Sequence, residues 1–187
     1  MAWNTSGLRG STLEELINMT NESYRKKGLA VVQKVPTPIT PVEVSNSPQS
    51  RNITLAYFGQ KSTVDYIGAA QGFPLCFDAK ETSAKSLPVN NIHEHQVEFM
   101  KDFERQGGLS FLIVHFRQFS EYYFLPFIVL QEFFEAAKNG GRKSIPYDAF
   151  QKKYLLQSKS GFSIHYLEGI NTYLDEKENR GEKTRHE

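Results

Sequence analysis

Three residues of this chain combine side-chain types and spacing that suit phosphodiester hydrolysis. Asp65 lies just before one candidate strand, while Asp78 and Lys80 lie two positions apart on the next. Side chains two apart on a strand point to the same face, and Asp65 can return to that face across a hairpin. Two carboxylates can hold a divalent cation that activates water and binds the phosphate, while the lysine offsets developing negative charge. The pattern therefore indicates a metal-dependent nuclease site.

The same three residues also allow a simpler interpretation, a surface salt bridge at the edge of a strand. The chain has 21 Asp and Glu and 22 Lys and Arg, so such a pattern can arise by chance. However, the apolar run Phe73–Phe77 before Asp78 indicates a buried strand. Burying charged side chains at the end of such a strand costs free energy unless they are paired or bind a metal. The context therefore favours the site.

Further motifs accompany this pattern along the chain, from about residue 9 to residue 174. They are Arg9-Gly10, Lys34-Val35-Pro36-Thr37-Pro38, Ala56-Tyr57-Phe58, Ser62-Thr63-Val64-Asp65-Tyr66, Asp78-Ala79-Lys80-Glu81-Thr82, His93-Glu94-His95-Gln96 and Asn139-Gly140-Gly141-Arg142-Lys143-Ser144-Ile145. In this order and spacing the sequence resembles the RecU-type Holliday junction resolvases of Gram-positive bacteria and their phages.

The resemblance implies an α/β fold of the restriction-endonuclease-like type, in which helices flank a central mixed β-sheet. It implies one nuclease domain over residues 1–174, with a protruding stalk at about 36–51. It also implies a structure-selective endonuclease that nicks two opposed strands of a four-way DNA junction in recombination and DNA repair. Such an enzyme is expected to act as a homodimer, with a recombinase or a branch-migration helicase as a further partner.

The resemblance also assigns the site. It implies that Thr63, Asp65, Asp78 and Gln96 surround Mg²⁺, with Mn²⁺ as a substitute, and that Lys80 stabilises the transition state. One departure concerns Asp78, where the family usually has glutamate. Because aspartate is one methylene shorter, the metal preference is left open.

Charge gives a weaker indication of DNA binding. The net charge is only +1, although residues 1–64 carry seven Lys or Arg against four Glu. DNA affinity should therefore rest on a local patch. The candidate DNA contacts are Arg9, Lys34, Arg51 and Lys61.

Two other motifs each allow more than one interpretation. Arg142-Lys143, after a helix end, is either a solvated turn or a DNA contact. His93-Glu94-His95 suggests zinc, but residues two apart on a helix do not share a face and no second ligand pair exists. Either histidine could instead contact a phosphate.

The helices and strands that must position the site follow from hydrophobic periodicity and from the residues that start and stop helices. Ser11 and Glu14 fit a capping box for a helix that runs to about Lys27. The proline-rich stretch after Val35 cannot be a central strand, and is either a functional excursion or a plain surface loop. The remaining predictions are strands at Leu29–Val35, Ile53–Phe58, Leu109–Val114 and Tyr122–Leu125, helices at Asn91–Gln106, Pro126–Asn139 and His165–Leu174, and a charged, disordered tail over residues 175–187.

Composition excludes several classes of protein. The chain has 187 residues with 39% apolar content, which fits one folded domain and excludes wholesale disorder. No apolar run reaches membrane-spanning length, no secretory signal is evident and no Gly-rich ATP loop is present. The single cysteine, Cys76, is expected to be a buried thiol in a reducing cytoplasm, so we expect a cytoplasmic, nucleoid-associated protein. Two alternatives to a resolvase remain: a non-catalytic junction-binding or recombinase-modulating protein, and a restriction endonuclease on the same fold.

Overall fold

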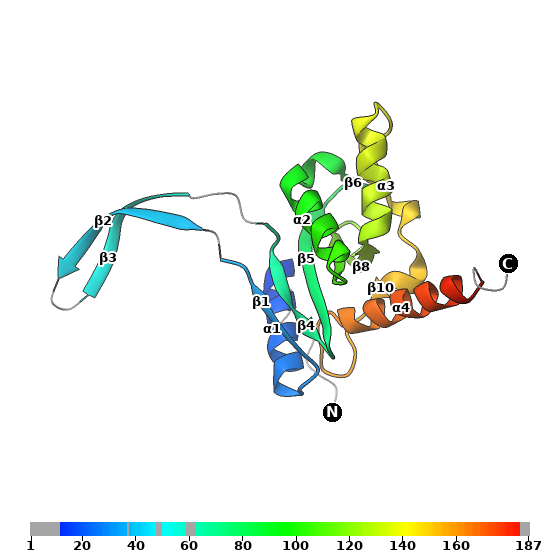
Figure 1. Ribbon diagram of the computed structural model, residues 1–187, viewed down its shortest axis with the longest axis horizontal. Coiled ribbons are helices and arrows are strands. Elements are labelled where there is room, and N and C mark those ends of the chain that lie inside the picture. Colours follow the sequence, from blue (N-terminus) through cyan, green and yellow to red (C-terminus); the bar gives the residue numbers. More distant parts are fainter. Residues whose placement is uncertain (1–11, 37, 48–49, 59–62, 184–187) are drawn as a thin grey trace.

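The computed structural model is shown in Figure 1. Two candidate DNA contacts, Arg9 and Lys61, lie outside the described part of the chain. The structure describes residues 12–36, 38–47, 50–58 and 63–183.

A six-stranded sheet forms the centre of the molecule, with the strand order β1-β4-β5-β7-β8-β10. β5 and β7 run parallel, and the other neighbouring pairs are antiparallel. The strands are β1 (Ala30–Lys34), β4 (Tyr66–Ala70), β5 (Phe73–Thr82), β7 (Leu109–Phe116), β8 (Glu121–Pro126) and β10 (Leu155–Leu156). The expected central mixed sheet is therefore confirmed.

Helices cover both faces of this sheet (Figure 1). α1 (Leu13–Lys26) and α4 (Tyr166–Lys183) pack on one face, and α2 (Glu94–Arg105) and α3 (Phe127–Lys138) pack on the other. Successive side chains of β5 divide between the two cores, with Phe77 in the α1–α4 core and Cys76 in the α2–α3 core. By the same alternation Asp78 and Lys80 point toward the α2 side.

Shorter elements complete the α2–α3 side. β6 (Ser86–Pro88) pairs with β9 (Ser144–Pro146) in a separate two-stranded sheet. Single 3₁₀ turns follow each of these strands, at Val89–Asn91 and Tyr147–Ala149, and another lies at Lys152–Tyr154. Within the described residues no helix combines the length and apolar content needed to cross a membrane.

The first helix begins one residue later than predicted. Thr12 is its N-cap, because Thr12 Oγ1 accepts a hydrogen bond from the Glu15 N–H at 3.3 Å. The Glu15 carboxylate in turn accepts one from the Thr12 N–H at 2.7 Å. This is a capping box with Thr12 and Glu15 in the roles expected for Ser11 and Glu14.

The expected disordered tail is wrong for residues 175–183, because α4 continues to Lys183. Glutamate and lysine are good helix formers, so a charged sequence can extend a helix whose first turns are buried. Glu176 also ties this extension to the body, through a hydrogen bond from the Tyr154 hydroxyl at 3.0 Å and an ion pair with Lys153.

The stalk is a two-stranded β-hairpin that projects from the body (Figure 1). Its strands are β2 (Ile39–Ser47) and β3 (Ser50–Phe58), which form a two-stranded sheet of their own within the described residues. The predicted boundaries of 36–51 were therefore too narrow, since the strand predicted at Ile53–Phe58 belongs to the stalk. Pro41 is accommodated beside a β-bulge, as expected for proline in a two-stranded ribbon.

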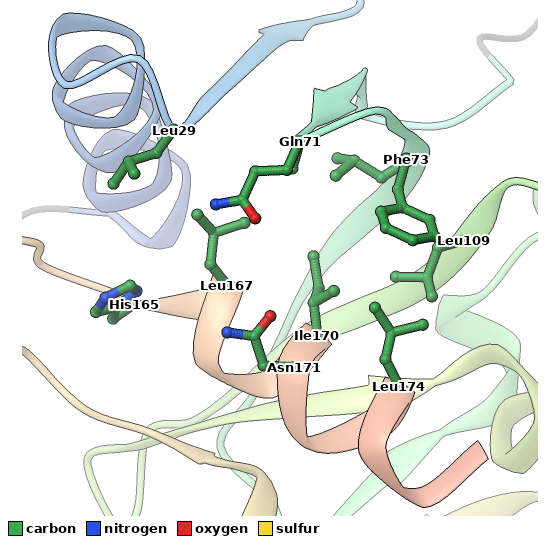
Figure 2. Close-up of a pocket in the computed structure, with 11 residues that line it drawn as sticks. Leu29, Gln71, Phe73, Leu109, His165, Leu167, Ile170, Asn171 and Leu174 are labelled. Atoms are coloured by element: carbon green, nitrogen blue, oxygen red, sulfur yellow. The ribbon is translucent and has the colours of Figure 1, made fainter. Parts of the chain in front are cut away.

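A hollow of about 240 Å³ lies at the end of the sheet where β4 turns into β5. Figure 2 shows α4 residues Ile170 and Leu174 lining it opposite Phe73 and Leu109. The β4–β5 turn at its rim has positive φ at Gln71 and Gly72, a common pattern for a two-residue hairpin. Asp65 precedes β4 and so lies at the other end of this hairpin, which separates the hollow from the predicted nuclease residues.

Candidate active site

The β4–β5 hairpin brings Asp65 and Asp78 together. Tyr66 pairs with Phe77, so the residues just beyond that pair face each other. The Asp65 N–H donates to Asp78 Oδ1 at 2.6 Å, and the Ala79 N–H donates to Asp65 Oδ2 at 3.0 Å. Each carboxylate is thus held by a backbone N–H from the other segment. The predicted return of Asp65 to the face of Asp78 is confirmed.

The part of β5 that carries Asp78 pairs with a neighbouring strand on one side. β5 continues to Thr82, but its pairing with β4 ends at Phe77. Beyond that point the described structure pairs β5 with β7 alone, and the Asp65 carboxylate takes the Ala79 N–H that a strand partner would otherwise bind. The acids therefore lie where the pairing of β5 with β4 ends, with the Asp65 side chain partly buried and the Asp78 side chain fully buried.

Lys80 is oriented toward the same point. Its Nζ lies 3.0 Å from Asp78 Oδ2 and 3.2 Å from Gln96 Oε1, and only 14% of its side chain is exposed. Two partners fix the ammonium before any substrate arrives. A donor held in place in this way stabilises developing charge without reorganising during the reaction.

Gln96 comes from the first turn of α2. The sequence placed the start of this helix at Asn91, but the structure places the N-cap at His93. Gln96 Oε1 accepts a hydrogen bond from the His93 N–H at 3.1 Å as well as from Lys80. Gln96 therefore faces β5 as predicted, and its hydrogen bond with Lys80 orients the lysine. Its role as a metal ligand stays a prediction.

Asp78 is the most strongly perturbed group of the site. Its side chain is fully buried, and this burial raises its pKa to about 6, while Lys80 opposes the shift and Asp65 adds to it. Asp78 Oδ2 is buried and lies 3.0 Å from the Lys80 ammonium, its ion-pair partner. A buried carboxylate is stable as an ion only when it is paired or binds a metal.

The donor set fits Mg²⁺. This ion is usually bound by one or two carboxylates, with water and substrate oxygens completing its shell. Asp65 and Asp78 supply two such groups, and half-buried Thr63 lies two residues before Asp65. Within residues 12–36, 38–47, 50–58 and 63–183 no group of three His, Cys, Asp or Glu gathers for a metal. Substrate and water oxygens would therefore have to complete the coordination.

The candidate DNA contacts are placed only in part. Lys34 is on β1 and forms an ion pair with Glu14 of α1. Arg51 is in the stalk, where its backbone pairs with Asn46, but its side chain lies outside the described part. Arg9 and Lys61 lie outside it entirely. Their contacts with DNA stay predictions.

We expect Asp78→Asn to stabilise the metal-free protein at alkaline pH. The pKa of Asp78 is about 6 in the fold against a usual 3.8, so the native state binds this proton more tightly than the unfolded chain. The free energy of unfolding should therefore fall as the pH rises from about 4 to about 6. An asparagine of the same shape removes this loss, which is about 3 kcal/mol at pH 8.

Urea unfolding in EDTA at pH 5 and pH 8 measures this effect. The exposed Asp175→Asn is the matched control and should change neither value. An Asp78→Asn protein that is less stable than wild type at pH 8 would contradict an unfavourable burial of the ionised carboxylate.

Comparison with known proteins identifies the family of this chain. The family model described as "Recombination protein U" matches residues 8–172. "Holliday junction resolvase RecU" of Streptococcus gordonii is 44% identical over 169 residues, covering 89% of this chain and 84% of the relative. The proteins of the same name from Pediococcus pentosaceus and Staphylococcus aureus are both 40% identical, and cover 90% and 93% of this chain and 86% of each relative. The chain therefore belongs to the RecU family.

Proposed function

We propose that this protein is a structure-selective endonuclease that resolves four-way DNA junctions by nicking two opposed strands. The observation that carries the proposal is the arrangement of Asp65, Asp78 and Lys80 where the pairing of β5 with β4 ends. Membership of the RecU family supports the substrate, since the curated relatives are named Holliday junction resolvases.

The residues of the site divide the chemistry among them. Mg²⁺, or Mn²⁺ in its place, supplies Lewis-acid activation of the phosphate and of water when it is bound. Asp65 and Asp78 would hold this ion, with Thr63 and Gln96 as supporting ligands. The Lys80 ammonium donates to the phosphate oxygens as negative charge develops on them. Gln96 keeps the ammonium aimed at that position through its hydrogen bond.

The symmetry of the substrate also suggests the oligomeric state of the protein. A four-way junction has twofold symmetry, and nicks in two opposed strands require two sites in a related orientation. We therefore propose a homodimer that acts in the cytoplasm on nucleoid DNA, together with a recombinase or a branch-migration helicase.

A comparison of junction and linear duplex tests the proposal. The wild-type protein should nick a four-way junction in Mg²⁺, should bind it without nicking in EDTA, and should leave the duplex intact. Binding without nicking in both Mg²⁺ and Mn²⁺ would favour the non-catalytic junction-binding alternative. Cleavage of the duplex at a fixed sequence would favour a restriction endonuclease.

The stalk supplies the second part of the proposal, which is recognition of shape. Ile53, Leu55 and Tyr57 alternate along β3 and are each at least half exposed. The stalk therefore presents apolar side chains to solvent, although the register shift between Glu43 and Val44 interrupts the alternation between Ile53 and Leu55. The open centre of a junction offers unstacked base faces to such side chains, whereas an intact duplex does not.

We expect a shortened stalk to lose selectivity for junctions. Pro41 and Ala56 are cross-strand partners, so an Asn-Gly turn between them can replace residues 42–55 and leave the base of the hairpin paired. Mobility shifts in EDTA should show about tenfold weaker junction binding or worse, with duplex binding unchanged. Equal loss for both substrates would make the stalk a general DNA contact, and no loss would make it a plain surface loop.

A further inference from the structure

Two motifs that the nuclease site does not use meet in one hollow of the structure. The hollow measures about 360 Å³ and lies between the start of α2, the end of α3 and the segment leading into β9. His93 and Glu94 line it from α2, and Lys138 and Lys143 line it from the other side. The sequence left open whether either histidine contacts a phosphate and whether Arg142-Lys143 contacts DNA.

The charges of this hollow leave one cation available. The Glu94 carboxylate forms an ion pair with Lys138, and this hydrogen bond raises the pKa of Lys138. The Lys138 ammonium also lies 5.1 Å from the centre of the Phe134 ring. Lys143, by contrast, is exposed and its side chain has no ion pair or hydrogen bond within the described residues. The charged lining residues therefore carry a net charge of +1, which matches one phosphodiester group.

The hollow is also connected to the nuclease site. The His93 N–H and the Lys80 ammonium both donate to Gln96 Oε1, at 3.1 and 3.2 Å. The residue at the rim of the hollow and the lysine of the active site therefore share one hydrogen-bond acceptor. On the far wall, the Lys143 carbonyl accepts a hydrogen bond from the Val89 N–H at 3.0 Å, which fixes the backbone from which Lys143 extends.

We propose that this hollow binds a DNA backbone phosphate close to the one that is cleaved, with the Lys143 ammonium as its counter-charge. The proposal rests on the proposed nuclease function. Each DNA strand carries a phosphate about every 3.4 Å along the helix axis. A strand whose scissile phosphate lies at Lys80 therefore brings other phosphates to the region beyond Gln96. Contact with this phosphate sets the register of the strand in the site.

Salt-dependent binding of Lys143→Gln tests the proposal. Anisotropy in EDTA with a four-way junction, at a series of salt concentrations, should give a salt slope lower than that of wild type by about 0.9. Affinity at moderate salt should fall about tenfold. Lys177→Gln is the matched control, because Lys177 is exposed on α4 and does not line the hollow, and its slope should equal that of wild type.

A neutral methylphosphonate placed at single positions around the nick identifies the phosphate. One position should weaken binding of the wild type and have no further effect on Lys143→Gln. If the wild type binds and nicks the junction but Lys143→Gln keeps the full salt slope, or every methylphosphonate affects both proteins equally, the hollow holds no phosphate. If the wild type itself neither binds nor nicks the junction, the nuclease function is what fails.

Discussion

Replacing Asp65 with asparagine should reduce strand nicking at least about a thousandfold while junction binding stays close to wild type. Asparagine keeps the shape of the side chain and an oxygen that can accept the Ala79 N–H, so the edge of β5 should remain intact. What is lost is one of the two negative charges available to a divalent cation. A metal ion contributes several kcal/mol to the stabilisation of the transition state, and each 1.36 kcal/mol is about tenfold in rate.

Three measurements separate this loss from a folding defect. Nicking of a labelled junction gives the rate, mobility shift in EDTA gives DNA binding, and calorimetry with Mn²⁺ gives the affinity for the ion. Asp175→Asn is the matched control and should behave as wild type in all three. Nicking by the Asp65→Asn protein at more than a few percent of the wild-type rate would exclude Asp65 as an essential ligand.

The strand pattern made the core of this site predictable. Asp78 and Lys80 share a face because strands alternate, and Asp65 returns to them because a hairpin joins β4 and β5. The depth of Asp78 was not predictable. The sequence indicates a buried strand before it, but only the structure shows that the carboxylate is out of contact with solvent and that this burial raises its pKa.

Helix starts were harder to place because local preferences compete. Ser11 and Thr12 are both good N-caps, and an acid follows three residues after each, so the sequence allows two registers for α1. At α2, asparagine is a favoured N-cap, yet Asn91 ends a 3₁₀ turn and the helix begins after His93. The Gln96 side chain stabilises that later start by accepting the His93 N–H. No periodicity in the sequence carries this information.

Composition also cannot say which sheet a strand joins. Ile53–Phe58 alternates as a strand should, and the same alternation suits the central sheet and a projecting ribbon equally well. The exposure of Ile53, Leu55 and Tyr57, each at least half, distinguishes the two only in the structure. We expect the same three exposed side chains to contact the junction, so the role of the stalk in recognition can be tested.

Lys80→Ala should lower the nicking rate by about 10²–10³. The Lys80 ammonium is held between Asp78 Oδ2 and Gln96 Oε1, so it is already in place when a phosphate reaches the acids. Its removal has a second consequence. Lys80 lowers the pKa of Asp78, which is already raised to about 6, so without Lys80 this pKa should rise further. Protons would then compete with the metal ion for the Asp78 carboxylate up to a higher pH.

The pH profile of nicking distinguishes this role from a structural one. The acidic limb of the profile should move to higher pH in Lys80→Ala, and raising the pH should recover part of the lost rate, since Asp78 is then ionised again. Gln96→Ala is the informative companion, because the ammonium remains tethered by Asp78 and the loss should be only about tenfold. A loss of under about tenfold in Lys80→Ala with an unchanged pH profile would reduce Lys80 to an ion-pair partner of Asp78. A larger loss together with the shifted profile would give Lys80 two roles. It would offset the negative charge of the transition state, and it would keep the neighbouring Asp78 ionised.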